Sequence, residues 1–346
     1  MDVAIIGASG SCGRQVAAQL LERSLLPTGS TVHLIGHRGG SHEDELWGLR
    51  ADLSDAFADR IHRIDIGTDV GQTGASLVVM MAGETMSTGK VDRDALAARN
   101  RRIFADSAAG VGRMQQPATV IVQSNPVELA VHEFCSVVDR HRVIGAGAWS
   151  DSLRFRREIA RELNISRPMV SAQMWGQHGD HLVPIWSRIH CRGVSQQQVD
   201  DMIGKARNGR ALSDFADEIV ELRTRVVKLI EDSRVEEAFT LVEAQPPDLR
   251  VAVKPFFTHF TAGGHTTELA TAHAVVDLIE FFAQGQEMVV PAQVRLETES
   301  PDLRGIVGVP VVLDQMEWSA DITLTVAKDE MDALQEAGSA IQQLIA

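Results

Sequence analysis

The sequence contains few cysteines, and none of them stands in a recognisable motif. Cys12, Cys135 and Cys191 are far apart, and their spacing matches neither a metal site nor a redox pair. We therefore expect reduced thiols and no bound metal. Reduced thiols are typical of a cytoplasmic protein.

Positive charge and long hydrophobic runs are also scarce. Lys and Arg number 33 against 47 Asp and Glu, so the net charge is −14 at pH 7. Such a surface repels polyanions, which argues against nucleic acid or an anionic membrane as the main partner. No apolar run approaches the roughly 20 residues of a membrane span. An acidic residue followed at once by an apolar segment leaves no room for a signal peptide. We expect a soluble cytoplasmic protein whose partner is a small molecule.

The length allows two lobes. At 346 residues, of which 44% are hydrophobic, the chain can bury a sizeable core. It contains no internal repeat and no low-complexity segment.

A glycine-rich turn follows the first apolar segment. Residues 3–6 read as a buried strand, an amphipathic helix follows the turn, and residues 31–35 read as a second strand. The G-x-x-G-x-x-G spacing is a variant of the dinucleotide fingerprint, in which glycines let a pyrophosphate approach a helix N-terminus. Such a turn also serves as a plain connection, but its place in a strand–helix–strand unit favours binding. The predicted cofactor-binding residues here are Gly7, Gly10, Ser11, Cys12 and Gly13.

A histidine stands in a second distinctive stretch, residues 174–184. His178 follows an apolar run that reads as a strand, and Gly176 and Gly179 flank it. Histidine is the side chain best suited to passing a proton near neutral pH. A lone histidine after a strand is more often structural, so this one needs a partner to count as catalytic.

Asp151 and Arg154 provide that partner. They are spaced i, i+3 in a segment that reads as a helix beginning near residue 149, so their side chains come together. A buried carboxylate can hold an imidazole in one tautomer, and a guanidinium can bind a carboxylate through two parallel hydrogen bonds. A 2-hydroxy acid dehydrogenase requires all three groups.

These motifs resemble the lactate/malate dehydrogenase superfamily. Gly-x-His-Gly-Asp is followed by Val-Pro-x-Trp-Ser and preceded by Asp-Ser-x-Arg-Phe-Arg, and the resemblance covers nearly the whole chain. It implies an α/β fold, with a Rossmann-type parallel sheet in residues 1–147 and a mixed α+β substrate lobe in 148–346. It also implies hydride transfer between a nicotinamide dinucleotide and a 2-keto or 2-hydroxy acid. His178 then protonates the carbonyl oxygen, Asp151 orients His178, and Arg154 binds the substrate carboxylate.

The resemblance implies further site residues. Ala82 and Gly83 end a strand where the nicotinamide cofactor crosses the sheet edge, and Asn125 contacts both nicotinamide and substrate. Arg93 stands in the segment of the family's mobile lid and polarises the carbonyl. Thr266 opens a helix that lines the substrate site.

Departures from the family pattern bear on cofactor and substrate. A member that uses NAD has an acidic residue near position 36 to bind the ribose 2′-hydroxyl, whereas this chain has Gly36, His37 and Arg38. Without that carboxylate a 2′-phosphate is not repelled, and Arg38 can pair with it. We therefore predict NADP, with NAD as the alternative.

A second departure concerns the substrate. In malate dehydrogenases an arginine binds the distal carboxylate of the substrate, and this chain has Met86 at that position. We predict a substrate with an uncharged side chain, and malate dehydrogenase activity is the alternative. A one-residue difference in loop length could instead bring Lys90 to this place.

Several helices are expected around these motifs. Residues 41–57 read as a helix that resembles the dimer-forming helix of cytosolic malate dehydrogenases, so we expect a homodimer. Residues 195–231 read as helical, and a helix is expected to end near residue 282. The stretch 232–260 is longer than in typical members, and we interpret it as a surface elaboration or as part of the pocket wall.

Two other classes of function remain open on the sequence alone. A family 4-type glycosidase also uses NAD, together with a metal, but no Cys/His pair stands at ligand spacing near Asn125. A non-catalytic dinucleotide sensor would not need His178, Asp151 and Arg154 together.

Overall fold

The computed structural model describes the chain except for residues 38–42, 61, 85–92, 262–266 and 321–324. Within the helices, the side chains of residues 93–96, 256 and 259–261 also lie outside the described part. No helix among the described residues is long and apolar enough to cross a membrane.

The chain divides into two compact units, each made of separate segments. Unit 1 comprises Met1–Ala146, Glu268–Val290 and Val311–Asp321, and unit 2 comprises Gly147–Thr267, Pro291–Pro310 and Ile322–Ala346. The first boundary lies beside the one predicted at residue 147. Two later segments return to unit 1, so a single cut in the sequence does not separate the units. A cofactor lobe followed by a substrate lobe stays a prediction.

Unit 1 is built on a parallel sheet. Its strands lie in the order β3-β2-β1-β4-β5-β6, which is that of a Rossmann fold, and this confirms the predicted fold class. Every residue of β1, β4 and β5 is buried, as expected for strands whose two faces are covered by helices. The strands are β1 Val3–Ile6, β2 Thr31–Ile35, β3 Arg63–Gly67, β4 Leu77–Met80, β5 Thr119–Val122 and β6 Val143–Gly145.

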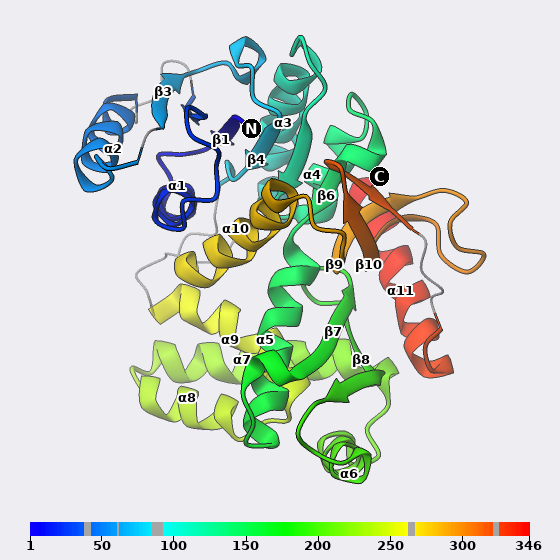
Figure 1. Cartoon of the computed structure of the whole chain (residues 1–346). Coiled ribbons are helices and arrows are strands. Elements are labelled where there is room, and N and C mark those ends of the chain that lie inside the picture. Colours follow the sequence, from blue (N-terminus) through cyan, green and yellow to red (C-terminus); the bar gives the residue numbers. More distant parts are fainter. Residues whose placement is uncertain (38–42, 61, 85–92, 262–266, 321–324) are drawn as a thin grey trace. The chain divides into compact units, whose positions relative to one another are not determined.

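Helices cover this sheet (Figure 1). Helix α10 packs on α1, where Nη1 of Arg23 lies 2.8 Å from Asp277 and 3.2 Å from Glu280. The short strand β11, Glu317–Ser319, pairs with the end of β10. The helices of unit 1 are α1 Ser11–Glu22, α2 Glu43–Ala56, α3 Arg93–Gly112, α4 Val127–Phe134 and α10 Glu268–Gln284.

Unit 2 combines an antiparallel hairpin with a helical layer. The hairpin consists of β7 (Val170–Gly176) and β8 (Leu182–Cys191), with Trp175 opposite Val183. β7 also pairs with β10 through Gly176 and Gly308. The other elements are α5 Gly147–Glu162, α6 Gln196–Arg207, α7 Phe215–Glu231, α8 Val235–Glu243, α9 Pro247–Thr261, β9 Met288–Leu296, β10 Gly305–Asp314 and α11 Lys328–Ile345; β9 and β10 each contribute one part to either unit.

The helical prediction for 195–231 was wrong in one respect. The segment forms two helices, α6 and α7, because Asn208 and Gly209 take left-handed backbone conformations with φ of 44° and 75° and end α6. Phe215, Ile219 and Val226 are buried and form the apolar face of α7.

The stretch 232–260 is a surface elaboration only in part. It forms α8 and α9, with Pro247 as the first residue of α9. Val251, Val253 and Phe257 of α9 are buried in one cluster with Phe155 of α5. The stretch is therefore part of the core of unit 2, and α9 packs directly on the helix that carries Asp151 and Arg154.

Candidate active site

The turn between β7 and β8 presents His178. Gly176 ends β7 with a φ of +80°, and a Cβ there would lie 2.7 Å from the carbonyl oxygen of His181. Glycine is therefore required at this position. The backbone N–H of Gln177 donates to the same carbonyl at 3.0 Å, which closes the turn. The sequence thus places His178 on a short, tightly closed loop.

Asp151 contacts both predicted partners. His178 Nδ1 lies 2.6 Å from Oδ2 of Asp151, and Nη1 of Arg154 donates to Oδ1 at 3.1 Å. The Asp151 side chain is only 3% exposed. A buried carboxylate that accepts from Nδ1 fixes the ring orientation and leaves proton exchange to Nε2.

Arg154 is held by two hydroxyl groups besides Asp151. Its Nη1 donates to Ser150 Oγ at 2.8 Å, and its Nη2 donates to Thr267 Oγ1 at 3.0 Å. Burial lowers the pKa of the Arg154 guanidinium, and the charge of Asp151 opposes this effect. Arginine keeps its charge even when buried, so the group stays a cation able to bind a carboxylate.

Two residues that support the site were missed from the sequence. Gly147 begins α5, and a Cβ there would lie 2.6 Å from Cγ of His178, so only glycine leaves room for the ring. Ser152 ties α5 to β7, because its hydroxyl accepts from Met174 N at 2.9 Å and donates to Ala148 O at 2.7 Å. Both positions look like ordinary helix residues in the sequence, since their role depends on a neighbour in space. The sequence also placed the start of this helix two residues too late.

The glycine-rich turn of unit 1 has the form of an anion site. Gly7 has a φ of +84°, and a Cβ at Gly13 would lie 2.3 Å from Gly7 O, so the turn and helix pack too closely for side chains. The first turn of α1, which starts at Ser11 and includes Cys12, contains no acidic residue, and Gly10 supplies no side-chain cap. The amide groups at this N-terminus are therefore suited to a phosphate. These residues fit a dinucleotide.

We expect the residues at the end of β2 to determine whether the chain binds NAD or NADP. Gly36 N donates to Gly67 O at 2.9 Å, and a Cβ at Gly36 would lie 2.6 Å from Cδ1 of Leu46 in α2. His37 is exposed. Arg38 lies outside the described residues.

Asn100 connects the predicted residues at the ends of β4 and β5. This buried side chain donates to Asn125 O at 2.9 Å and to Glu84 O at 3.0 Å, and it accepts from Glu84 N at 2.7 Å. The exposed Asn125 and the segment with Ala82 and Gly83 are thereby held together. Asn100 was missed because it stands inside the α3 segment, away from any motif.

Several predicted residues cannot be placed. Met86, Lys90 and Thr266 lie outside the described residues, and so does the side chain of Arg93, which begins α3. The neighbouring Thr267 is described and contacts Arg154. Within the described ranges, no group of three or more His, Cys, Asp or Glu side chains could hold a metal ion.

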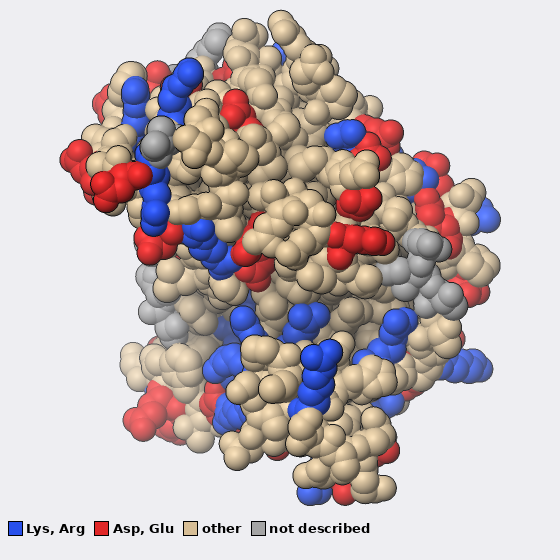
Figure 2. Space-filling view, in the orientation of Figure 1, with Lys and Arg blue, Asp and Glu red and all other residues tan. Residues whose placement is uncertain are grey.

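A surface cavity of about 340 Å³ lies elsewhere on unit 1. It is lined by residues of α1, α2 and β3 and their connections, including Arg50, Arg60 and Arg63. Figure 2 shows Lys and Arg side chains in a column over this part of the molecule. None of the predicted site residues that the structure describes lines the cavity.

Comparison with known proteins identifies the family. Residues 1–145 match the family described as lactate/malate dehydrogenase, NAD binding domain. The L-lactate dehydrogenase A chain of Ambystoma mexicanum is 30% identical over 66% of this chain and 67% of its own length. The malate dehydrogenase of Methanothermobacter thermautotrophicus is 25% identical over 99% of this chain and 95% of its own length.

Solved structures show the same fold. The lactate dehydrogenase of Cryptosporidium parvum in complex with lactic acid and nicotinamide adenine dinucleotide matches 99% of this chain and 96% of its own, with a TM-score of 0.76 and 22% identity. The malate dehydrogenase of Aeropyrum pernix gives a TM-score of 0.75 at 20% identity, over 99% and 97%.

The chain belongs to the lactate/malate dehydrogenase family. It is a 2-hydroxy acid dehydrogenase that depends on a nicotinamide dinucleotide. This membership argues against both alternatives, a family 4-type glycosidase and a non-catalytic dinucleotide sensor.

Proposed function

We propose that this protein interconverts a 2-keto acid and a 2-hydroxy acid with NADP(H), and that its preferred substrate has an uncharged side chain. The observation that carries the proposal is the buried carboxylate of Asp151, which contacts His178 and Arg154 at once. A proton-transfer group and a carboxylate-binding group are thereby fixed relative to each other. A 2-keto acid offers an oxygen for the first group and a carboxylate for the second.

His178 is the proposed acid–base group. In the reducing direction its Nε2 donates a proton to the carbonyl oxygen of the substrate, and Asp151 stabilises the imidazolium that exists before the transfer. In the oxidising direction the same nitrogen accepts the hydroxyl proton. Acid–base assistance of this kind contributes about 10² to 10⁴ in rate. The dinucleotide, when bound, supplies or accepts the hydride.

Arg154 is the proposed substrate anchor. Its guanidinium binds the carboxylate next to the reacting carbon through two parallel hydrogen bonds. Nη2 of Arg154 also donates to Thr267 Oγ1, which orients the guanidinium. Following the family resemblance, Arg93 polarises the carbonyl, Asn125 contacts substrate and nicotinamide, and Thr266 and Met86 line the pocket.

The preference for NADP rests on the residues at the end of β2. Gly36 puts no carboxylate where a 2′-phosphate would bind, the exposed His37 follows it, and Arg38 adds a cation in the sequence. One observation favours the malate alternative: the relative that is similar to nearly the whole chain is the malate dehydrogenase of Methanothermobacter thermautotrophicus.

The test is a matrix of cofactors and substrates. NADPH and NADH oxidation are each measured with pyruvate, 2-ketoisocaproate and oxaloacetate. We expect the highest kcat/KM with NADPH and an uncharged 2-keto acid. Equal use of both cofactors contradicts the NADP proposal, and a clear preference for oxaloacetate contradicts the substrate proposal.

The assembly and location are further parts of the proposal. We propose a homodimer, because α2 lies where the resemblance expects a dimer-forming helix and its Trp47 side chain is 56% exposed. We also propose a cytoplasmic location, because reduced thiols are typical of that compartment. Light scattering of the purified protein measures the mass directly. A monomer would contradict this part of the proposal alone.

A further inference from the structure

Arg223 of α7 is bound to the turn that carries His178. It forms an ion pair with Asp180, two residues after the histidine, and its Nη2 donates to the carbonyl oxygen of Ala252 in α9 at 3.2 Å. The Arg223 side chain is only 14% exposed. One partly buried guanidinium therefore connects the histidine turn to α9.

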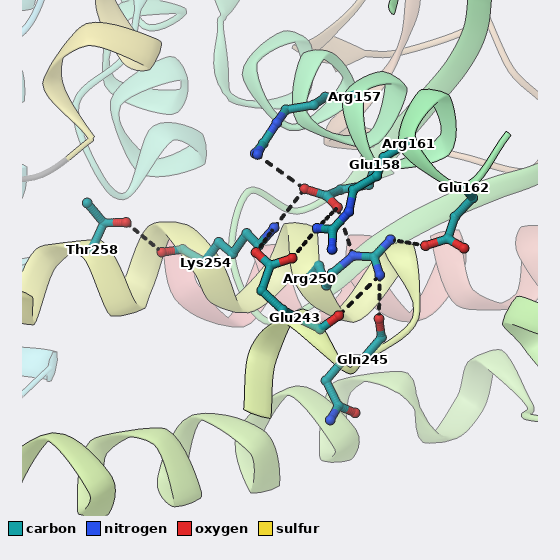
Figure 3. Close-up of polar contacts among 9 residues, drawn as sticks. All are labelled: Arg157, Glu158, Arg161, Glu162, Glu243, Gln245, Arg250, Lys254 and Thr258. Atoms are coloured by element: carbon teal, nitrogen blue, oxygen red, sulfur yellow. Dashed lines mark hydrogen bonds and ion pairs between the residues drawn. The ribbon is translucent and has the colours of Figure 1, made fainter. Parts of the chain in front are cut away.

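The same stretch of α9 holds the helix that carries Asp151. Nε of Arg250 lies 2.7 Å from Glu158 of α5, and Nζ of Lys254 lies 2.9 Å from it. Figure 3 shows both cations converging on Glu158, together with Arg157 and Arg161 of α5 itself. Glu158 is 1% exposed, so these contacts are screened little by water. Ala252 stands between the two cations in the sequence.

We propose that Arg223 is a positioning residue that holds His178 in register with Asp151. The histidine turn is anchored on α9 through Arg223, and α5 is anchored on α9 through Glu158. Both members of the 2.6 Å His178–Asp151 pair thus share one support. Removal of the Arg223 side chain frees the turn from that support and takes the paired cation away from Asp180. This proposal rests on the proposed role of His178.

The main test compares Arg223→Met with the unmodified protein. We expect kcat to fall by up to about 100-fold, the size of loss that a misplaced catalytic group produces. The Kd for the dinucleotide should not change, because the glycine-rich turn belongs to unit 1. Arg223→Lys should recover part of kcat, since it restores the charge but not the guanidinium geometry.

Arg210→Met is the matched control. Arg210 also forms ion pairs in unit 2, with Glu218 and, at 3.1 Å, with Asp248 of α9. Its side chain is 21% exposed, and its hydrogen bonds go to Glu218, Asp248 and the carbonyl oxygen of Ala206, none of which belongs to the histidine turn. Both substitutions should lower Tm, but only Arg223→Met should lower kcat. An equal loss of kcat in both variants would reduce Arg223 to a general stabiliser and overturn the proposal.

A double-mutant cycle tests the route of the effect. Asp180→Asn and Arg223→Met remove the same contact, so the double variant should lose no more kcat than Arg223→Met alone. Additive losses would show that Arg223 acts by another route, which contradicts the proposal.

A measurement without turnover separates this inference from the proposed function. The imidazole NMR signals of His178, assigned with His178→Asn, should shift or broaden in Arg223→Met and stay in place in Arg210→Met. If the unmodified protein reduces no 2-keto acid, the proposed function is wrong. The NMR comparison still tests whether Arg223 positions His178. Unchanged His178 signals in Arg223→Met would overturn the positioning role whatever the activity.

Discussion

A single carboxylate does two tasks in unit 2. Asp151 accepts from His178 with one oxygen and from Arg154 with the other, so the ring orientation and the position of the guanidinium depend on each other. The space for this arrangement comes from a residue without a side chain, Gly147 at the start of α5. We therefore expect a substitution that adds only volume, and no charge, to disturb the geometry of this site.

Gly147→Ala should impair catalysis through steric displacement. The new Cβ would lie 2.6 Å from His178 Cγ, closer than any unstrained contact, so the ring must move away from Asp151. We expect a loss in kcat of at least about 10-fold from this misplacement. Gly204→Ala in α6 is the control: its Cβ meets nothing within 4 Å, so it should stabilise the helix by about 1 kcal/mol and leave kcat unchanged. Normal kcat in Gly147→Ala would contradict the placement of His178.

Arg154→Lys should weaken substrate binding. An ammonium group cannot form the two parallel hydrogen bonds of a guanidinium, so KM for the 2-keto acid should rise strongly while the Kd for the dinucleotide stays the same. Arg157→Lys serves as the control, because the Arg157 side chain is 63% exposed on the same helix. An unchanged KM in Arg154→Lys would remove Arg154 from the role of substrate anchor.

The sequence was informative at this scale where residues stand in motifs. His178, Asp151 and Arg154 were predicted as a set, and the structure brings them together. Gly147 and Asn100 were not predicted, because glycine at a helix start and asparagine within a helix are common for other reasons. Their roles depend on contacts between segments that are far apart in the chain.

At the scale of elements, α2 restricts what the end of β2 can hold. Leu46 of α2 is fully buried and lies where a side chain at Gly36 would begin. The residue that we propose to distinguish NAD from NADP is therefore linked to the packing of a neighbouring helix. This contact is invisible in the sequence, where ten residues separate the two positions.

Gly36→Asp alone should not convert the cofactor preference cleanly. Its Cβ would lie 2.6 Å from Leu46 Cδ1, so the variant should lose stability as well as gain a carboxylate. We expect the shift toward NADH in kcat/KM to be larger in Gly36→Asp with Leu46→Ala than in Gly36→Asp alone. Leu46→Ala by itself should lower the free energy of unfolding by about 2–5 kcal/mol and keep the original preference. A full switch in the single variant with unchanged Tm would contradict the steric account.

The helical stretch after α7 shows why element roles were harder to predict than element types. The break between α8 and α9, at Pro246 and Pro247, is visible in the sequence. The place of α9 in the core is not, since its apolar face is defined by contacts with α5, α7 and α8. The stretch 232–260, which is longer than in typical family members, thus contains a helix that packs against the helix carrying Asp151.

At the scale of the whole molecule, the ion pairs around α9 make stability depend on pH. Burial raises the pKa of Glu243, but hydrogen bonds from Lys254 and Arg161 outweigh this effect and lower the pKa from the ordinary 4.5 to about 2 (Figure 3). Because the folded-state value lies below the unfolded one, this interaction stabilises the fold fully above about pH 4.5. It is lost as the pH falls toward 2.

Glu243→Gln should therefore destabilise the protein at neutral pH and not in acid. Urea unfolding at a series of pH values should give a difference from the unmodified protein that is constant above about pH 4.5 and shrinks below it. Glu221→Gln, an exposed residue of α7, should leave the free energy of unfolding nearly unchanged throughout. A Glu243→Gln difference that is the same at every pH would contradict the depressed pKa.

The central claim concerns the acid–base role of His178 in the reduction of a 2-keto acid. The most direct measurement is kcat of His178→Asn with the best substrate of the panel, together with the dinucleotide Kd from fluorescence titration. We predict a loss of kcat of at least about 100-fold, with Kd unchanged, because the ring transfers a proton and does not hold the nucleotide. Substantial turnover by His178→Asn would contradict the claim and direct attention to His181.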